Sequence, residues 1–135
     1  MKNLNTALVQ KTLALLAGIG FLVFLFLIEK PPTHREQNGS PPEIGARIYT
    51  TRCSACHGQN LQGNSGPNLI DSYWIHGKGT KEDVINMIKN GALSMGMPAW
   101  VGILSESEIS AVSEFILSHK GSQPANAKGP QGQLF

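Results

Sequence analysis

Residues 51–60, "TRCSACHGQN", contain both cysteines of this 135-residue chain, placed three positions apart and followed at once by a histidine. On a helix, residues three apart lie on the same face, so the thiols of Cys53 and Cys56 are expected to point in one direction. Two thiols in this arrangement can hold a metal, cycle as a disulfide, or attach a group covalently. The remaining sequence has to distinguish among these chemistries.

The run Cys53–His57 has the form C-x-x-C-H, which is the attachment pattern of c-type haem. Sulfurs on one helix face can reach the two vinyl groups of one porphyrin, and the next residue can direct its imidazole at the iron. The pattern therefore predicts one covalently bound haem c, attached through Cys53 and Cys56 and ligated by His57.

Other chemistries for the cysteine pair are less well supported. A structural zinc site needs four ligands, and the chain has no second cysteine pair. A thioredoxin-like dithiol follows a strand in an α/β fold, which this sequence does not indicate. A disulfide across three positions would close too short a loop to stabilise much. These three readings remain as alternatives to haem.

The second axial ligand is expected in "MGMPAW", residues 95–100. Gly96 allows close approach of the backbone, and Pro98 keeps the chain out of a helix, so the thioether of Met97 can enter from a loop. The alternatives are Met95, His76 and an open position; Met87 and His119 fall in predicted helices. Ligation by His57 and Met97 would raise the reduction potential and leave no free position for a substrate, which predicts an electron carrier rather than an enzyme.

The N-terminal region contains the uncharged run "LALLAGIGFLVFLFLI", residues 13–28. Extended back to Ala7, it is long enough for a single membrane-spanning helix. A cleaved signal peptide and a buried core helix are the alternatives. Lys2 and Lys11 precede the run and favour a cytoplasmic N-terminus. We therefore expect residues 1–30 to anchor the chain in the cytoplasmic (inner) membrane, with the remainder facing the periplasm or cell exterior.

The composition limits the folded part and its partners. Only 15% of residues are charged and the formal net charge is +2, which gives no basic patch suited to nucleic acid. Residues 31–42 are rich in proline and predict a linker, and residues 121–135 are rich in Gly, Pro, Asn and Gln and predict a disordered tail. Residues 43–120 then form one small domain.

Within that domain, periodicity and capping residues predict three helices, near residues 42–55, 80–90 and 105–120. Thr80 with Asp83, and Ser105 with Glu108, read as capping boxes. The Gly-rich segments between the helices do not alternate like strands. The prediction is an all-α unit whose long loops form the walls of a pocket.

Four blocks give this domain a family resemblance: "GARIYTTRCSACHG", "GPNL", "MPAW" and "SESEISAVSEFILSHKG". Together they resemble the class I c-type cytochromes. The resemblance implies the small cytochrome c fold, with Gly45 and Tyr49 of the first helix packed against Phe115 or Ile116 of the last. Tyr49 is also expected at the haem pocket.

The same resemblance assigns further pocket residues. Pro67 matches the proline of "GPNL", whose carbonyl oxygen accepts a hydrogen bond from the proximal histidine, here His57. That bond would fix the ring and raise its basicity. Trp74 and Trp100 are expected to wall the pocket.

Within the class, "NLQGNSGPNLIDSYWIHG" followed by "GMPAW" is similar to the haem domains of the membrane-anchored c-type subunit of cbb3-type cytochrome oxidases. That subunit usually carries two haem motifs, and this sequence carries one. The resemblance implies a membrane-anchored single-haem cytochrome of a respiratory chain. It would take electrons from a quinol-oxidising complex and be a donor to, or a subunit of, a terminal oxidase. A haem enzyme or a gas or redox sensor with a labile sixth ligand, and a haem-free thiol–disulfide protein, are the alternatives.

Overall fold

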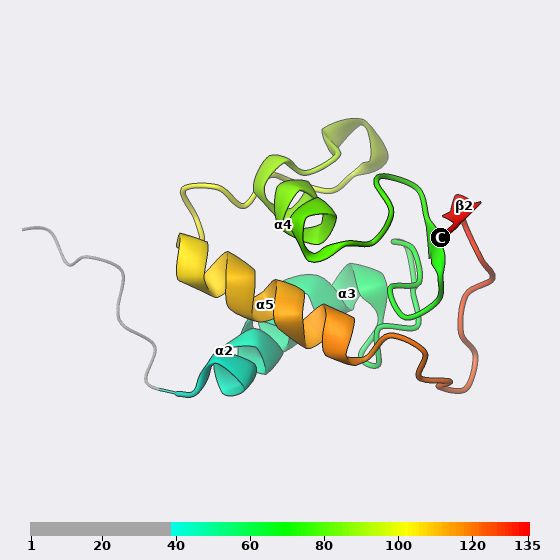
Figure 1. The fold of residues 1–135 in the computed structure, drawn as a ribbon, viewed down its shortest axis with the longest axis horizontal. Helices are drawn as coiled ribbons and strands as arrows, with labels where there is room; N and C mark the ends of the chain where they lie inside the picture. The colour runs from blue at the N-terminus through cyan, green and yellow to red at the C-terminus, as the bar shows by residue number, and fades with distance from the viewer. Residues whose placement is uncertain (1–38) are drawn as a thin grey trace, which may run out of the picture. The chain divides into compact units, whose positions relative to one another are not determined.

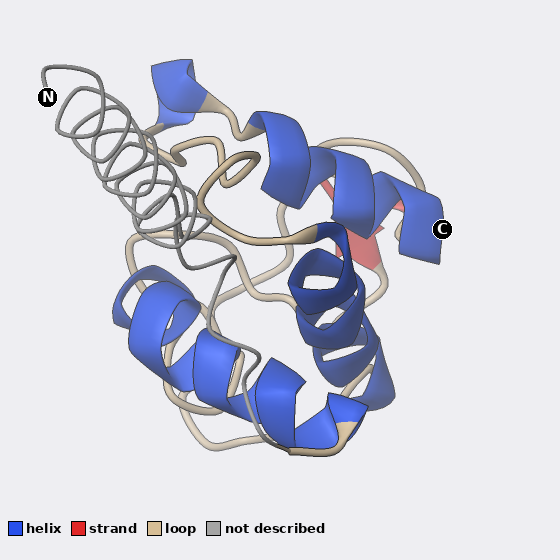
Figure 2. Ribbon diagram, turned by 90° about the vertical axis from the view of Figure 1, so that its left-hand side faces the viewer, coloured by secondary structure: helices blue, strands red, loops and turns tan. Residues whose placement is uncertain are grey.

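The computed structural model describes residues 39–135, which form helices and long loops with one small two-stranded sheet (Figure 2). The α-helices are α2 (Pro41–Ile48), α3 (Ser54–His57), α4 (Lys81–Asn90) and α5 (Glu106–Ser118); the strands are β1 (Tyr73–Trp74) and β2 (Gln133–Leu134). The predicted anchor and most of the predicted linker lie outside the described residues. Among residues 39–135, no helix has the length and hydropathy needed to cross a membrane.

Two of the three predicted helices begin where their capping residues indicated. Thr80 caps α4, its hydroxyl accepting a bond from the amide of Asp83, and Ser105 caps α5 in the same way with Glu108. In both boxes the carboxylate bonds back to the backbone amide of the cap residue, so two otherwise unpaired donors are satisfied. These local sequences are therefore sufficient to define both helix starts.

The first helix differs from its prediction at both ends. It begins at Pro41 after the cap residue Ser40, so the last residues of the predicted linker are helical. It also continues beyond Ile48 as a π-helix, η1 (Tyr49–Cys53), and then as α3, which ends at His57 and not near residue 55. In the π-helix the amide of Ser54 bonds to the carbonyl of Tyr49, five residues back. Such a bulge inserts a residue into the helix and is frequent beside functional sites.

The first and last helices pack against each other at Gly45 (Figure 1). A Cβ at this position would overlap the carbonyl oxygen of Ala111 and lie 2.9 Å from Cβ of Phe115. The ring of Tyr49 lies beside Phe115, with a distance of 5.4 Å between ring centroids. The close contact between the first and last helices, predicted from the family resemblance, is thus present at Gly45 and Tyr49.

The C-terminal tail, residues 121–135, which the sequence predicted to be disordered, lies along the domain in the structure. In Figure 1 its red end lies beside the green segment that contains β1. β2 pairs with β1 in antiparallel register, Tyr73 opposite Leu134 and Trp74 opposite Gln133. The composition of the tail did not indicate this packing, because many of its hydrogen bonds are made by backbone groups. Every residue type except proline carries the same backbone donor and acceptor.

The buried core is small. It consists of apolar side chains from the helices and from the segment that follows α3: Ile48, Tyr49, Leu61, Ile70, Val84, Ile88, Ile109, Val112 and Ile116. Helices dominate, as predicted, and the strands contribute two residues each. Four core residues of α4 and α5 also line a cavity, described below: Val84, Ile88, Val112 and Ile116.

We predict that Gly45→Ala will destabilise the domain by about 1–3 kcal/mol, because the added methyl group must separate α2 from α5. Chemical denaturation of the holoprotein measures the change. Gly129→Ala is the matched control, since a Cβ there meets no atom within 4 Å. Equal stability of the two variants would contradict the tight crossing.

Candidate haem site

A cavity of about 360 Å³ lies between the C-x-x-C-H helix, α4, α5 and the methionine-containing loop. This volume falls within the range of about 300–1,000 Å³ that is usual for cofactor pockets. Most of the residues chosen from the sequence line it: Cys53, Cys56, His57, Pro67, Trp74, Met97 and Trp100. Segments far apart in the chain thus bring these side chains to one space.

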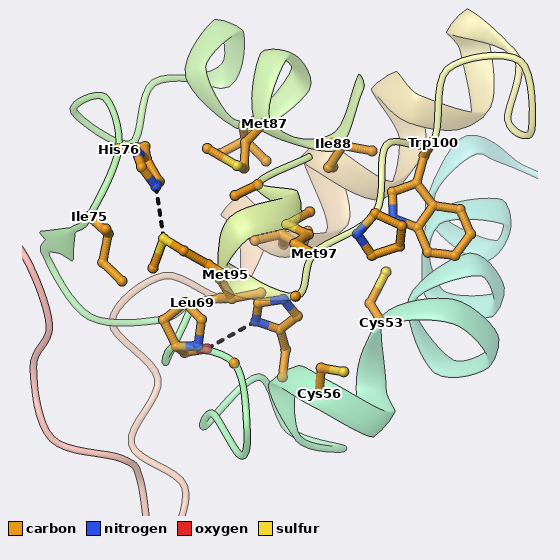
Figure 3. Close-up of a pocket in the computed structure, with 18 of the residues that line it drawn as sticks. Cys53, Cys56, Leu69, Ile75, His76, Met87, Ile88, Met95, Met97 and Trp100 are labelled. Carbon is orange, nitrogen blue, oxygen red and sulfur yellow. Dashed lines mark hydrogen bonds between the residues drawn. The ribbon is translucent and has the colours of Figure 1, made fainter. Parts of the chain in front are cut away.

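The two cysteines are free thiols and lie on the same side of the cavity (Figure 3). Cys53 is half-buried, and burial, together with repulsion from Cys56, raises the pKa of Cys53 to about 11. Its thiol is therefore neutral at physiological pH. Since disulfide exchange requires a thiolate, this environment makes Cys53 a poor attacking thiol.

His57 is held by a hydrogen bond of 3.0 Å between its Nδ1 and the carbonyl oxygen of Pro67. A carbonyl oxygen only accepts, so Nδ1 carries the proton and Nε2 keeps its lone pair. Burial lowers the pKa of His57, and the positive charge of Lys128 acts in the same direction, whereas the bond to Pro67 opposes them. The imidazole is therefore neutral at physiological pH, which is the form that ligates a metal.

The two candidate methionines of the loop are placed differently. Met97 is half-buried at the cavity, and its backbone pairs with Ala92 in an isolated bridge. Met95, in the 3₁₀ turn η2 (Leu93–Met95), is 59% exposed, and its sulfur accepts a bond of 3.4 Å from Nε2 of His76 (Figure 3). Met97, Met95 and His76 all line the cavity, and Met97 is the most buried of the three.

Trp74 and Trp100 contribute large apolar walls to the cavity, as expected. Trp74 also carries a polar group without a partner: its Nε1 is buried and forms no hydrogen bond with the described residues. A buried indole N–H usually has an acceptor. Its location on a cavity wall fits a bound group that has polar substituents, as a porphyrin with propionates has.

Tyr49, expected at the haem pocket, is not among the residues that line the cavity. Its side chain is 1% exposed in the core beside Phe115, and its hydroxyl donates a bond of 2.7 Å to the carbonyl of Gly58. Burial raises the pKa of Tyr49, so the hydroxyl stays protonated. Its function is to hold the turn that follows His57 against the helices.

Several cavity residues were not anticipated from the sequence. Lys128 and Gln131 reach the cavity from the tail, and Arg52 and Ile75 contribute to its wall. Lys128 is the single charged residue of the tail, which was the one available signal. His119, weighed as a ligand, instead directs Nδ1 at the carbonyl of Phe115, 2.8 Å away.

The residues around the cavity fit a haem c. Two free thiols, a neutral imidazole with an available Nε2 and a thioether from the facing loop surround one largely apolar space. Residues 39–135 contain no group of three or more His, Cys, Asp or Glu side chains placed to hold a metal ion by themselves.

Comparison with known proteins gives the same family. Residues 40–116 match the family described as "Cytochrome C oxidase, cbb3-type, subunit III". A cbb3-type oxidase subunit FixP of Bradyrhizobium sp. (strain ORS 278) is 36% identical over 88 residues, which cover 63% of this chain and 30% of that protein. A subunit CcoP of Rhodobacter capsulatus is 32% identical over 101 residues, covering 66% and 34% respectively. The chain thus spans about a third of the length of these relatives.

Two further comparisons concern cytochromes of similar domain size and fold. Cytochrome c6 of Euglena viridis is 34% identical over 87 residues, covering 62% of this chain and 98% of that protein. The crystal structure of cytochrome cL from Methylophaga aminisulfidivorans aligns with a TM-score of 0.56 at 22% identity, over 65% of this chain and 74% of that one, which shows the fold. With the family match extending over most of the folded residues, the chain belongs to the cbb3-type cytochrome c oxidase subunit III family, as a c-type cytochrome domain.

Proposed function

We propose that this chain is a membrane-anchored, single-haem c-type cytochrome that passes one electron at a time to a cbb3-type terminal oxidase, as its donor or as one of its subunits. The observation that carries the proposal is the meeting of Cys53, Cys56, His57 and Met97 at one cavity. Cys53 and Cys56 would attach haem through thioethers, and Nε2 of His57 and the sulfur of Met97 would ligate its iron.

When bound, haem c supplies a one-electron iron couple at this site. The chain itself controls that couple through position and environment. The carbonyl of Pro67 holds His57 in one tautomer and orientation. Trp74 and Trp100 give the cavity apolar walls, which reduce the access of water to a bound haem. A methionine ligand favours the reduced state of the iron. If His57 and Met97 both ligate the iron, no ligand position is left for a substrate, so the proposed role is that of a carrier and not an enzyme.

The N-terminal segment, residues 1–30, is proposed as a single-pass anchor in the cytoplasmic (inner) membrane, with the haem domain on the periplasmic or outer side. The formal net charge of +2 gives little long-range steering towards a partner. Anchoring compensates by raising the effective concentration of the domain at a membrane-bound partner. A quinol-oxidising complex is the proposed source of electrons.

We predict that Met97→Ala will abolish the weak long-wavelength absorption band that marks sulfur coordination to oxidised haem, while haem stays attached on denaturing gels. The visible and near-infrared spectrum of the purified holoprotein measures this. Met95→Ala is the matched control and should keep the band, because Met95 is largely exposed. Loss of the band in Met95→Ala and not in Met97→Ala would show that Met95, and not Met97, is the ligand. A wild-type protein without the band would favour a haem enzyme or sensor.

The assignment to an oxidase predicts that the full chain co-purifies with a haem–copper oxidase when native membranes are solubilised in mild detergent. Subunit composition by mass spectrometry and oxygen uptake by the fraction measure this. The control is the same domain with residues 1–30 replaced by a cleavable signal peptide, which should be recovered as soluble red protein. Recovery of the full chain in membranes but free of oxidase would support a tethered shuttle instead of a subunit.

A further inference from the structure

The C-terminal strap, defined here as residues 121–135, runs alongside the segment that comes directly after His57 in the sequence. The amide of Gly121 bonds to the carbonyl of Ile70 at 2.6 Å, and the amide of Phe135 bonds to that of Ser72 at 2.9 Å. β2, inside the strap, pairs with β1. These backbone bonds attach the strap at both ends, and Lys128 lies between them.

Lys128 places its ammonium among the carbonyl groups of the loop that precedes Pro67. Its Nζ lies 3.1, 3.4 and 3.2 Å from the carbonyl oxygens of Asn64, Ser65 and Gly66. One ammonium with three donors can satisfy three acceptors, and charge-assisted bonds are stronger than neutral ones. The convergence of three carbonyls on one cation is a defined site and not an incidental surface contact.

The backbone of Lys128 is fixed as firmly as its side chain. Its amide donates a bond of 2.8 Å to the carbonyl of Gln62, and its carbonyl accepts one of 3.1 Å from Nδ2 of Asn68. Gly63 allows this approach, since a Cβ there would lie 2.9 Å from Cβ of Lys128, and its φ of +86° disfavours other residues. The backbone of Lys128 is therefore bonded to Gln62 and Asn68, at the two ends of the loop, and its side chain is bonded to residues 64–66 between them.

The same loop holds the imidazole of His57. The amide of Gly66 bonds to the carbonyl of Cys56 at 2.8 Å, and a Cβ on Gly66 would lie 2.9 Å from Cε1 of the His57 ring. The next residue, Pro67, supplies the acceptor for Nδ1. Any shift of residues 64–67 would thus move both the packing surface and the hydrogen-bond acceptor of His57.

We propose that Lys128 is a positioning residue for the loop that orients His57, and that its charge makes the haem easier to reduce. This rests on the proposed function, because it concerns the haem that His57 would ligate. Reduction adds an electron at the iron, so a fixed positive charge that lines the cavity favours the reduced state. The loop that Lys128 holds also supplies the acceptor that orients His57, and outer-shell groups of this kind are a second influence on the metal.

The test compares three variants of the full-length holoprotein. Lys128→Gln removes the charge but keeps an amide donor, and Lys128→Arg keeps the charge. Lys78→Gln removes one charge from an exposed loop position. The reduction potential is measured by spectroscopic redox titration, and backbone hydrogen–deuterium exchange is followed for residues 62–68.

Lys128→Gln is expected to lower the potential by more than Lys78→Gln does and to increase deuterium uptake in residues 62–68. Lys128→Arg should restore both values to near those of the wild type. A potential in Lys128→Gln equal to that of Lys78→Gln, or an unchanged uptake, would overturn the proposal. A wild-type chain without a reversibly titrating haem would refute the proposed function itself, whereas a normal wild type with unaffected Lys128 variants would refute only the role of Lys128.

Discussion

The hydrogen bond between Nδ1 of His57 and the carbonyl of Pro67 is the interaction on which the site depends. It fixes the tautomer, so that the other ring nitrogen is free to ligate, and it fixes the plane of the ring. The bond joins a residue at the end of α3 to a loop ten residues later, and that loop has no regular secondary structure of its own. Its geometry must therefore be imposed by contacts from elsewhere in the fold.

Those contacts come from three directions. Gly45 lets α2 and α5 approach closely, which gives a rigid support for the helix that carries the cysteines. The hydroxyl of Tyr49 holds the turn at Gly58, immediately after His57. The strap holds the loop from the outside through Lys128. These contacts support the walls of the cavity, and four of the nine buried core residues also line it. A domain of this size often depends on a cofactor for part of its interior.

The sequence predicts the parts of this arrangement that are encoded locally. The capping residues Thr80 and Ser105 define two helix starts, and the C-x-x-C-H run predicts the segment that would attach haem. The resemblance to class I cytochromes adds the contact at Gly45 and the acceptor at Pro67. Each of these signals is confined to a few neighbouring residues or to a family motif.

The features that were missed depend on contacts between distant segments. The strap is polar and its bonds are mostly made by the backbone, so composition indicated disorder. The π-helix at Tyr49–Cys53 was also missed, because its sequence has the same apolar pattern as an ordinary α-helix. Its extra residue changes where the cysteine-containing turn lies relative to α2. The expectation that Tyr49 lies at the pocket came from the family resemblance, which does not show that this side chain is buried in the core.

The proposed function requires a covalently attached haem in the cavity that His57 and Met97 line. The most direct measurement is the intact mass of the chain purified under denaturing conditions from a host able to mature c-type cytochromes. We expect the measured mass to equal that of the polypeptide plus one haem. Neither Cys53 nor Cys56 should then react with a thiol-alkylating reagent. A mass equal to that of the polypeptide alone, with both thiols alkylated, would contradict it.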